Sequence, residues 1–136
     1  MTVATPPADP SLAARSTPWS AIVWWEIRRI PFNIALAVAG LASLAAIYGV
    51  FDPLVPPGED LIEPVPLYLA VGLYAAMANA GYTLGWVSEL IWSGGDPART
   101  EPFRARVFYA GLLGSVTLTL APAAVAGLAW LLIRGS

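Results

Sequence analysis

The sequence predicts an all-α membrane protein with three transmembrane helices preceded by an N-terminal interfacial helix. Hydrophobic residues make up 57% of the 136 residues, and the mean hydropathy of +0.66 exceeds that of ordinary soluble domains. The few charged residues are clustered, which leaves charge-free windows of 22, 25 and 27 residues at 30–51, 64–88 and 107–133. Each window exceeds the roughly 20 helical residues that cross a bilayer core about 30 Å thick.

Helices are expected in these windows because a helix satisfies its own backbone hydrogen bonds in lipid. If the windows were core helices of a soluble protein, the remaining chain would be too short to enclose them. A cleaved signal peptide is disfavoured, because residues 1–18 contain four prolines and no apolar run. The first window is also longer than the usual signal core of about 7 to 15 residues, so we expect it to be retained.

The prolines and glycines of the chain set the expected boundaries of the helices. Thr17 and Pro18 suit a helix N-terminus, whereas Pro31 should kink or break the helix that follows. A proline-rich external loop and a turn at 93–97 separate the later helices. The prediction is one membrane domain, 1–136, with an extended tail at 1–18, an interfacial helix at 19–30 and transmembrane helices at 31–51, 66–92 and 104–133.

The arginines predict the orientation. Only Arg134 lies at the C-terminal end, whereas the loop between the first two spans carries four acidic residues and no arginine. By the positive-inside rule, the N-terminus is expected in the cytoplasm and the C-terminus outside. Five of the six tryptophans would then lie near the cytoplasmic boundary, as expected of an aromatic belt. The six arginines predicted on the cytoplasmic side are Arg15, Arg28, Arg29, Arg99, Arg104 and Arg106.

The residue types that are missing exclude several kinds of chemistry. The chain has no cysteine and no histidine, which removes disulfides, Fe–S clusters, the common zinc sites and the usual haem ligands. Ser-His and Cys-His nucleophile arrangements are removed as well. The small net charge of −2 does not favour nucleic acid. We therefore expect no catalytic or metal site and no cofactor of the chain's own.

The cytoplasmic boundary carries the charged candidates. Glu89 is expected close to this interface, at the depth of four arginines, where an ion pair would lock the helices together; a transport or binding role is the alternative. Glu26 has the same two interpretations: an ion pair that holds the structure together, or a transport or binding role. Trp24 and Trp25 suit the headgroup layer. The set predicted for interfacial anchoring and ion pairs is Trp24, Trp25, Glu26, Arg28, Arg29, Arg104 and Arg106.

The second window carries the polar candidates within the membrane. Asn79 and Thr83 share a helix face and need partners, for which Ser43, Ser115, Thr117 and Thr119 lie at a comparable depth. Helix packing is the plainer interpretation; a small polar ligand, a pigment or a quinone is the alternative. Small residues at four-residue spacing also favour contact with another chain. The set predicted for helix packing or partner contact is Asn79, Gly81, Tyr82, Thr83, Gly85, Trp86 and Glu89.

Two segments carry a resemblance. Residues 25–33, Trp-Glu-Ile-Arg-Arg-Ile-Pro-Phe-Asn, and residues 79–89, Asn-Ala-Gly-Tyr-Thr-Leu-Gly-Trp-Val-Ser-Glu, resemble uncharacterised small bacterial membrane proteins. Those proteins carry a Trp-Glu near the first helix and an Asn-x-x-Tyr-Thr-Leu-Gly-Trp-x-x-Glu segment in the second. We expect a multi-pass protein of the bacterial cytoplasmic (inner) membrane; because those proteins have no assigned activity, the resemblance contributes no function. It draws attention to Glu26, Asn33, Asn79, Tyr82, Trp86 and Glu89.

Three functions are compatible with this pattern. The first is a non-catalytic accessory subunit packed on the membrane core of a respiratory, photosynthetic or transport complex, with membrane lipids and other membrane subunits as partners. Such a subunit could contact a bound lipid, or a pigment or quinone held by partner chains. The second is a homo-oligomeric carrier or channel lined by Asn79, Thr83, Ser115 and Thr119. An enzyme acting on a lipid phosphate is third, because no nucleophile or metal set accompanies the interfacial charges.

Overall fold

Three long helices contain most of the residues that the computed structural model describes, which are 18–93 and 97–135. They are α2 (Pro18–Phe51), α3 (Pro64–Ser93) and α4 (Pro97–Gly135), and a short 3₁₀ helix, η1 (Asp52–Leu54), follows α2. The all-helical prediction is confirmed for this part of the chain. At 1.5 Å per residue the 34, 30 and 39 residues of the long helices correspond to about 51, 45 and 58 Å.

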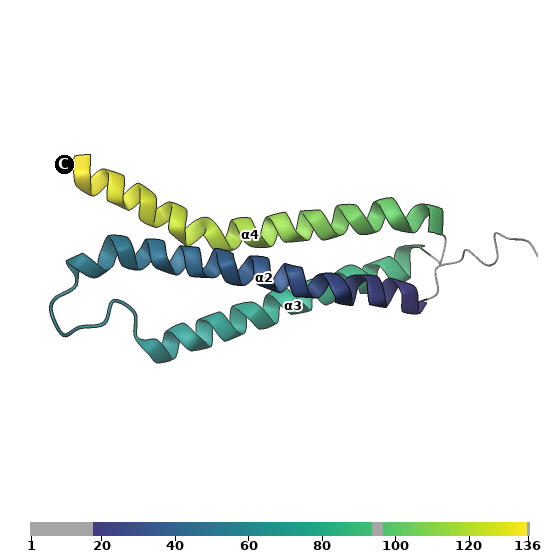
Figure 1. Cartoon of the computed structure of the whole chain (residues 1–136), viewed down its shortest axis with the longest axis horizontal. Coiled ribbons are helices and arrows are strands. Elements are labelled where there is room, and N and C mark those ends of the chain that lie inside the picture. Colours follow the sequence, from purple (N-terminus) through teal and green to yellow (C-terminus); the bar gives the residue numbers. More distant parts are fainter. Residues whose placement is uncertain (1–17, 94–96, 136) are drawn as a thin grey trace, which may run out of the picture.

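The three helices lie alongside one another with α2 in the middle (Figure 1). α3 runs antiparallel to α2, and α4 runs parallel to it. α2 packs mainly against α4. The yellow C-terminal part of α4 turns away from α2, in the part of the helix that contains Pro122. A proline within a helix removes one backbone hydrogen bond and is a common cause of such bends.

The predicted break at Pro31 is wrong. α2 is one continuous helix from Pro18 to Phe51, so residues 19–30 and 31–51 are not separate elements. Pro31 is exposed, whereas Trp25 before it and Phe32 after it are buried in one cluster. Packing on both sides of the proline therefore holds the helix direction despite the missing donor.

The other boundaries differ by a few residues. The predicted segment 66–92 lies within α3, and 104–133 lies within α4, which begins earlier at Pro97. In the predicted external loop, η1 forms its first turn, and Gly58 adopts the left-handed region at φ 93°. The tail 1–17 and residues 94–96 of the predicted turn lie outside the described residues.

Both apolar and polar side chains are buried between the described helices, whereas large apolar side chains cover much of the outer surface. Five residues form the buried apolar cluster, yet Glu89, Arg104 and Ser43 are buried beside them. Large apolar side chains are exposed along all three helices, among them Val38 on α2, Leu73 on α3 and Leu113 on α4. A soluble domain does not expose contiguous apolar surface on this scale. The apolar cluster consists of Trp25, Phe32, Leu36, Tyr82 and Phe108.

Length and composition alone identify two helices that could cross a membrane. One is Trp19–Leu54, which comprises nearly all of α2 together with η1. The other is Glu101–Gly135, which is most of α4. α3 is not selected. Asn79 and several glycines and tyrosines interrupt its apolar residues, although α3 is on average at least as apolar as α2 and α4.

Candidate functional site

A buried ion pair joins α3 to α4. Arg104 donates to both oxygens of Glu89, with Nη2 to Oε1 at 2.6 Å, Nε to Oε1 at 2.9 Å and Nε to Oε2 at 3.1 Å. The Trp25 indole N–H on α2 donates to Oε2 of Glu89 at 2.6 Å. Glu89 is 0% exposed. One carboxylate therefore holds side chains from both neighbouring helices, and its bidentate geometry fixes their orientation.

Aromatic packing positions Trp25 for this contact. The far edge of its ring lies over Gly85, where a Cβ atom would come within 3.0 Å of Cη2. Tyr82 meets the Trp25 ring edge-on, with centroids 5.3 Å apart, and its hydroxyl donates to the Trp25 carbonyl. Phe108 packs against both rings. The glycine at position 85 is thus required by the close approach of an indole from the same chain.

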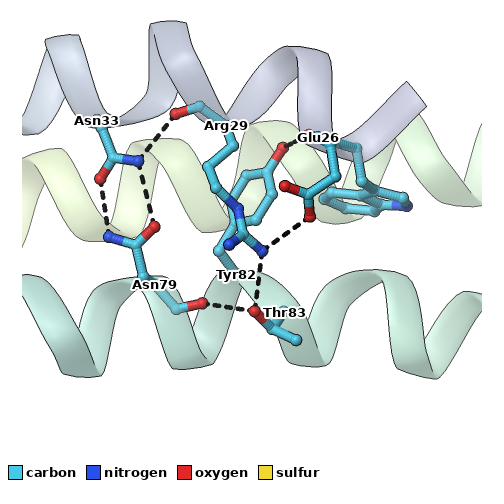
Figure 2. A network of polar contacts seen from close by, with 7 residues as sticks. Glu26, Arg29, Asn33, Asn79, Tyr82 and Thr83 are labelled. Atoms are coloured by element: carbon cyan, nitrogen blue, oxygen red, sulfur yellow. Dashed lines mark hydrogen bonds and ion pairs between the residues drawn. The ribbon is translucent and has the colours of Figure 1, made fainter. Parts of the chain in front are cut away.

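A second group of polar contacts joins α2 to α3 (Figure 2). Asn33 and Asn79 exchange hydrogen bonds through their amides, at 2.8 and 3.2 Å. Arg29 donates to the Thr83 hydroxyl at 3.0 Å and forms an ion pair with Glu26 at 3.0 Å. All five side chains lie in the space between the two ribbons. This group lies further along the bundle than Glu89, on the side of the loop that joins α2 to α3.

A third group joins all three helices closer still to the loop. The Tyr74 hydroxyl on α3 lies 2.5 Å from the Thr119 hydroxyl on α4 and donates to the Ser115 carbonyl at 3.2 Å. Ser43 on α2 donates to the Thr119 carbonyl at 2.5 Å. The three groups together form an interhelical polar network that runs along the bundle. In a membrane, each such contact stabilises helix association by about 0.6 to 2 kcal/mol.

Two clefts flank this network. One, of about 410 Å³, lies beside Trp25 and Tyr82 and is bordered by Gly81, Gly85 and Gly111. The other, of about 670 Å³, separates α2, α3 and α4 nearer the loop, where Gly40, Val71 and Pro122 are among its lining residues. Both linings are largely apolar. The helices therefore make close contact through their polar groups but leave apolar spaces between them.

The structure brings most of the predicted packing residues together. Tyr82, Thr83, Gly85 and Glu89 all contact α2 or α4, and Asn79 contacts α2. Of the four arginines considered as partners of Glu89, the described contacts select Arg104. Two cationic side chains lie over the Trp24 ring, with the Arg28 guanidinium carbon 3.7 Å and that of Arg104 5.2 Å from its centroid.

Trp25 and Asn79 are placed differently from our expectation, whereas the roles expected of Gly81, Arg106 and Trp86 stay predictions. Trp25 is not a headgroup anchor, because it is buried between the helices and only 2% exposed. Asn79 pairs with Asn33 rather than with a serine or threonine of another span. Gly81 faces open space, and Arg106 is exposed. Trp86 packs partly buried against the apolar cluster, and its indole N–H is buried with no hydrogen-bond partner in the described structure.

Sequence reasoning missed Asn33 as a partner of Asn79, although a signal was present. Both residues lie equally far along the chain from Pro56, in the middle of the loop, and so do Arg29 and Thr83. In an antiparallel helix pair, residues equidistant from the connection lie at the same height. The core positions Phe32, Phe108 and Tyr74 were missed as well, because apolar windows do not reveal which face of a helix is buried.

The hydrogen bonds of this network join the three helices to one another. In the described part of the chain, most polar side chains between the helices are hydrogen-bonded to one another, whereas the Trp86 indole N–H and Arg29 Nε are buried without a partner; no group of three carboxylates gathers to hold a metal ion. Comparison with protein-family models, curated protein sequences and solved structures finds no match for this chain. The resemblance to small bacterial membrane proteins therefore stays a prediction.

Proposed function

We propose that this chain crosses the membrane three times, with its N-terminus in the cytoplasm, and acts as a non-catalytic accessory subunit of a larger membrane complex. The observation that carries the proposal is the combination of polar contacts between the helices with an apolar outer surface. Polar side chains hold α2, α3 and α4 together, while apolar side chains cover the outer surface. Lipid favours both arrangements, and water favours neither.

The antiparallel packing supports α3 as the third span, although length and composition alone do not identify it as one. α3 contacts α2 through Asn79, Thr83 and Glu89, and it also contacts α4 through Tyr74, so its polar contacts extend from Tyr74 to Glu89. Its polar residues therefore lie on the side that faces the bundle. The opposite side exposes Leu69, Leu73 and other large apolar residues. A helix that accompanies two spans over this length crosses the same bilayer.

The same contacts favour an accessory subunit over a carrier. A carrier path lined by Asn79, Thr83, Ser115 and Thr119 would need these groups to face a central pathway. Instead Asn79 and Thr83 contact α2 of the same chain, and Thr119 contacts Tyr74. What remains for a partner is the apolar outer surface and the two clefts, which suits packing against other membrane helices.

The topology can be tested with single cysteines, because the native chain contains none. A membrane-impermeant maleimide added to right-side-out vesicles should label Glu59→Cys in the external loop. It should label Glu101→Cys only after the membrane is opened. Labelling of Glu101→Cys in sealed vesicles would contradict the third span, because it would place the start of α4 outside.

The accessory role can be tested by the mass of the complex extracted in a mild detergent. We expect the 14.3 kDa chain to form part of a complex whose mass comes mostly from other membrane proteins at a fixed stoichiometry. A complex made only of several copies of the chain would favour the carrier. A monomer would contradict both functions.

A further inference from the structure

Arg28 differs from its neighbours in lacking a described acidic partner. Arg29 pairs with Glu26, and Arg104 pairs with Glu89. Arg28 instead lies over the Trp24 ring at 3.7 Å, and its only described hydrogen bond is a long one of 3.4 Å from Nη1 to the Trp24 carbonyl. An arginine in the headgroup layer is attracted by the negative charge of anionic lipids. Arg28 is therefore ordered by stacking but not neutralised by a described carboxylate.

A second cation strengthens the positive charge at this place. The guanidinium carbon of Arg104 lies 5.2 Å from the same Trp24 ring. Its Nε and Nη2 are used by Glu89, whereas its Nη1 makes no hydrogen bond in the described contacts. Two guanidinium groups thus share one indole, with a single described carboxylate paired to one of them. We propose that Arg28, held on the Trp24 ring beside the buried Arg104, binds the phosphate of one anionic phospholipid at the cytoplasmic interface.

The depth of Arg28 suits a lipid phosphate. About 20 helical residues cross the hydrocarbon core, and counting them back from Phe51, at the external end of α2, leads close to Pro31. Arg28 then lies just beyond the hydrocarbon, in the headgroup layer. This step rests on the proposed membrane topology.

The neighbouring surface of α2 favours a lipid over free phosphate. An exposed apolar stripe starts one residue from Arg28 and continues at helical spacing toward the middle of the span. A phospholipid whose phosphate binds Arg28 can lay an acyl chain along this stripe, whereas free phosphate gains nothing from it. The stripe consists of Ile27, Ile30, Ile34, Val38 and Leu41.

The test measures lipid binding to the full chain purified in a mild detergent. Native mass spectrometry and thermal unfolding are recorded with phosphatidylglycerol, phosphatidylcholine or inorganic phosphate. We expect one retained phosphatidylglycerol, bound at least about fivefold more tightly than phosphatidylcholine, since one arginine near the surface contributes about 1 kcal/mol. Inorganic phosphate at the same concentration should not raise the unfolding temperature.

Two variants test whether the lipid binds at Arg28. Arg28→Gln should lose about fivefold of the preference for phosphatidylglycerol, whereas Arg106→Gln, at an exposed arginine near the same end, should keep it. Equal binding of the two lipids by the native chain, or an unchanged preference in Arg28→Gln, would overturn the site. Stabilisation by inorganic phosphate alone would also overturn it. If the chain stays soluble without detergent, the proposed topology fails; if it needs detergent but shows no lipid preference, only the lipid site fails.

Discussion

Glu89 shows how a single residue can connect a three-helix bundle. Its carboxylate accepts hydrogen bonds from Trp25 on α2 and Arg104 on α4 while lying on α3. Removing one partner of a buried pair leaves the other charge without compensation. The residue is therefore more sensitive to substitution than its position near a helix end implies.

We predict that Glu89→Gln lowers the free energy of unfolding by about 3 to 5 kcal/mol, because Arg104 is left buried and unpaired. Denaturant unfolding in detergent, followed by circular dichroism, measures the change. Glu101→Gln, at an exposed glutamate on α4, is the control and should be neutral. The double variant Glu89→Gln with Arg104→Gln should lose less than the sum of the single changes. A stable Glu89→Gln variant would show that the pair does not hold the helices.

Gly85 and Gly81 form a matched pair for testing the approach of Trp25. A methyl group at position 85 would lie 3.0 Å from the Trp25 ring, which its hydrogen bond to Glu89 holds in place. At position 81 a methyl group meets nothing within 4 Å. We expect Gly85→Ala to destabilise the fold by about 1 to 3 kcal/mol. Gly81→Ala should be neutral or stabilise it by about 0.5 to 1 kcal/mol. Equal effects of the two changes on the unfolding midpoint would contradict the packing described.

At the scale of elements, α2 illustrates packing that overrides a local signal. Proline in a helix interior is about 3 kcal/mol less favourable than alanine, yet α2 continues through Pro31. Trp25 and Phe32, on either side of it, are buried in the same cluster. Tertiary contacts therefore keep the helix continuous in spite of the proline, and they do not depend on it.

Pro31→Ala should accordingly keep the fold and raise the free energy of unfolding, by up to about 3 kcal/mol. The side chain of Pro31 is exposed, so little packing is lost, and the new N–H restores a backbone hydrogen bond. Thermal unfolding compared with Pro53→Ala, at a proline in η1 outside the long helices, measures the gain. A loss of stability would mean that the shape imposed by the proline is itself needed.

For the molecule as a whole, the effect of a substitution on the apolar surface depends on whether water or lipid surrounds that surface. Leu73 on α3 is 64% exposed and Leu54 in η1 is 62% exposed. In water, aspartate would be tolerated equally at the two positions. In a bilayer, Leu73 lies within the hydrocarbon and Leu54 at its edge.

We predict that Leu73→Asp costs about 2.5 to 3.5 kcal/mol of membrane insertion, whereas Leu54→Asp costs little. A glycosylation-based insertion assay on the full chain reads out both variants. Similar insertion of the two would argue against α3 as a span. The pair therefore tests the element that hydropathy alone does not select.

The sequence by itself determined the all-helical class and the approximate position of each helix, because apolar length and charge clustering are properties of the chain taken in order. Only the tertiary structure decided which polar atoms meet: Glu89 with Arg104 and Trp25, and Asn79 with Asn33. These pairings depend on how far each helix is rotated about its axis and shifted along its neighbour. Rotation and shift are set by interlocking side chains such as Trp25 against Gly85, and a window of apolar residues carries no record of them.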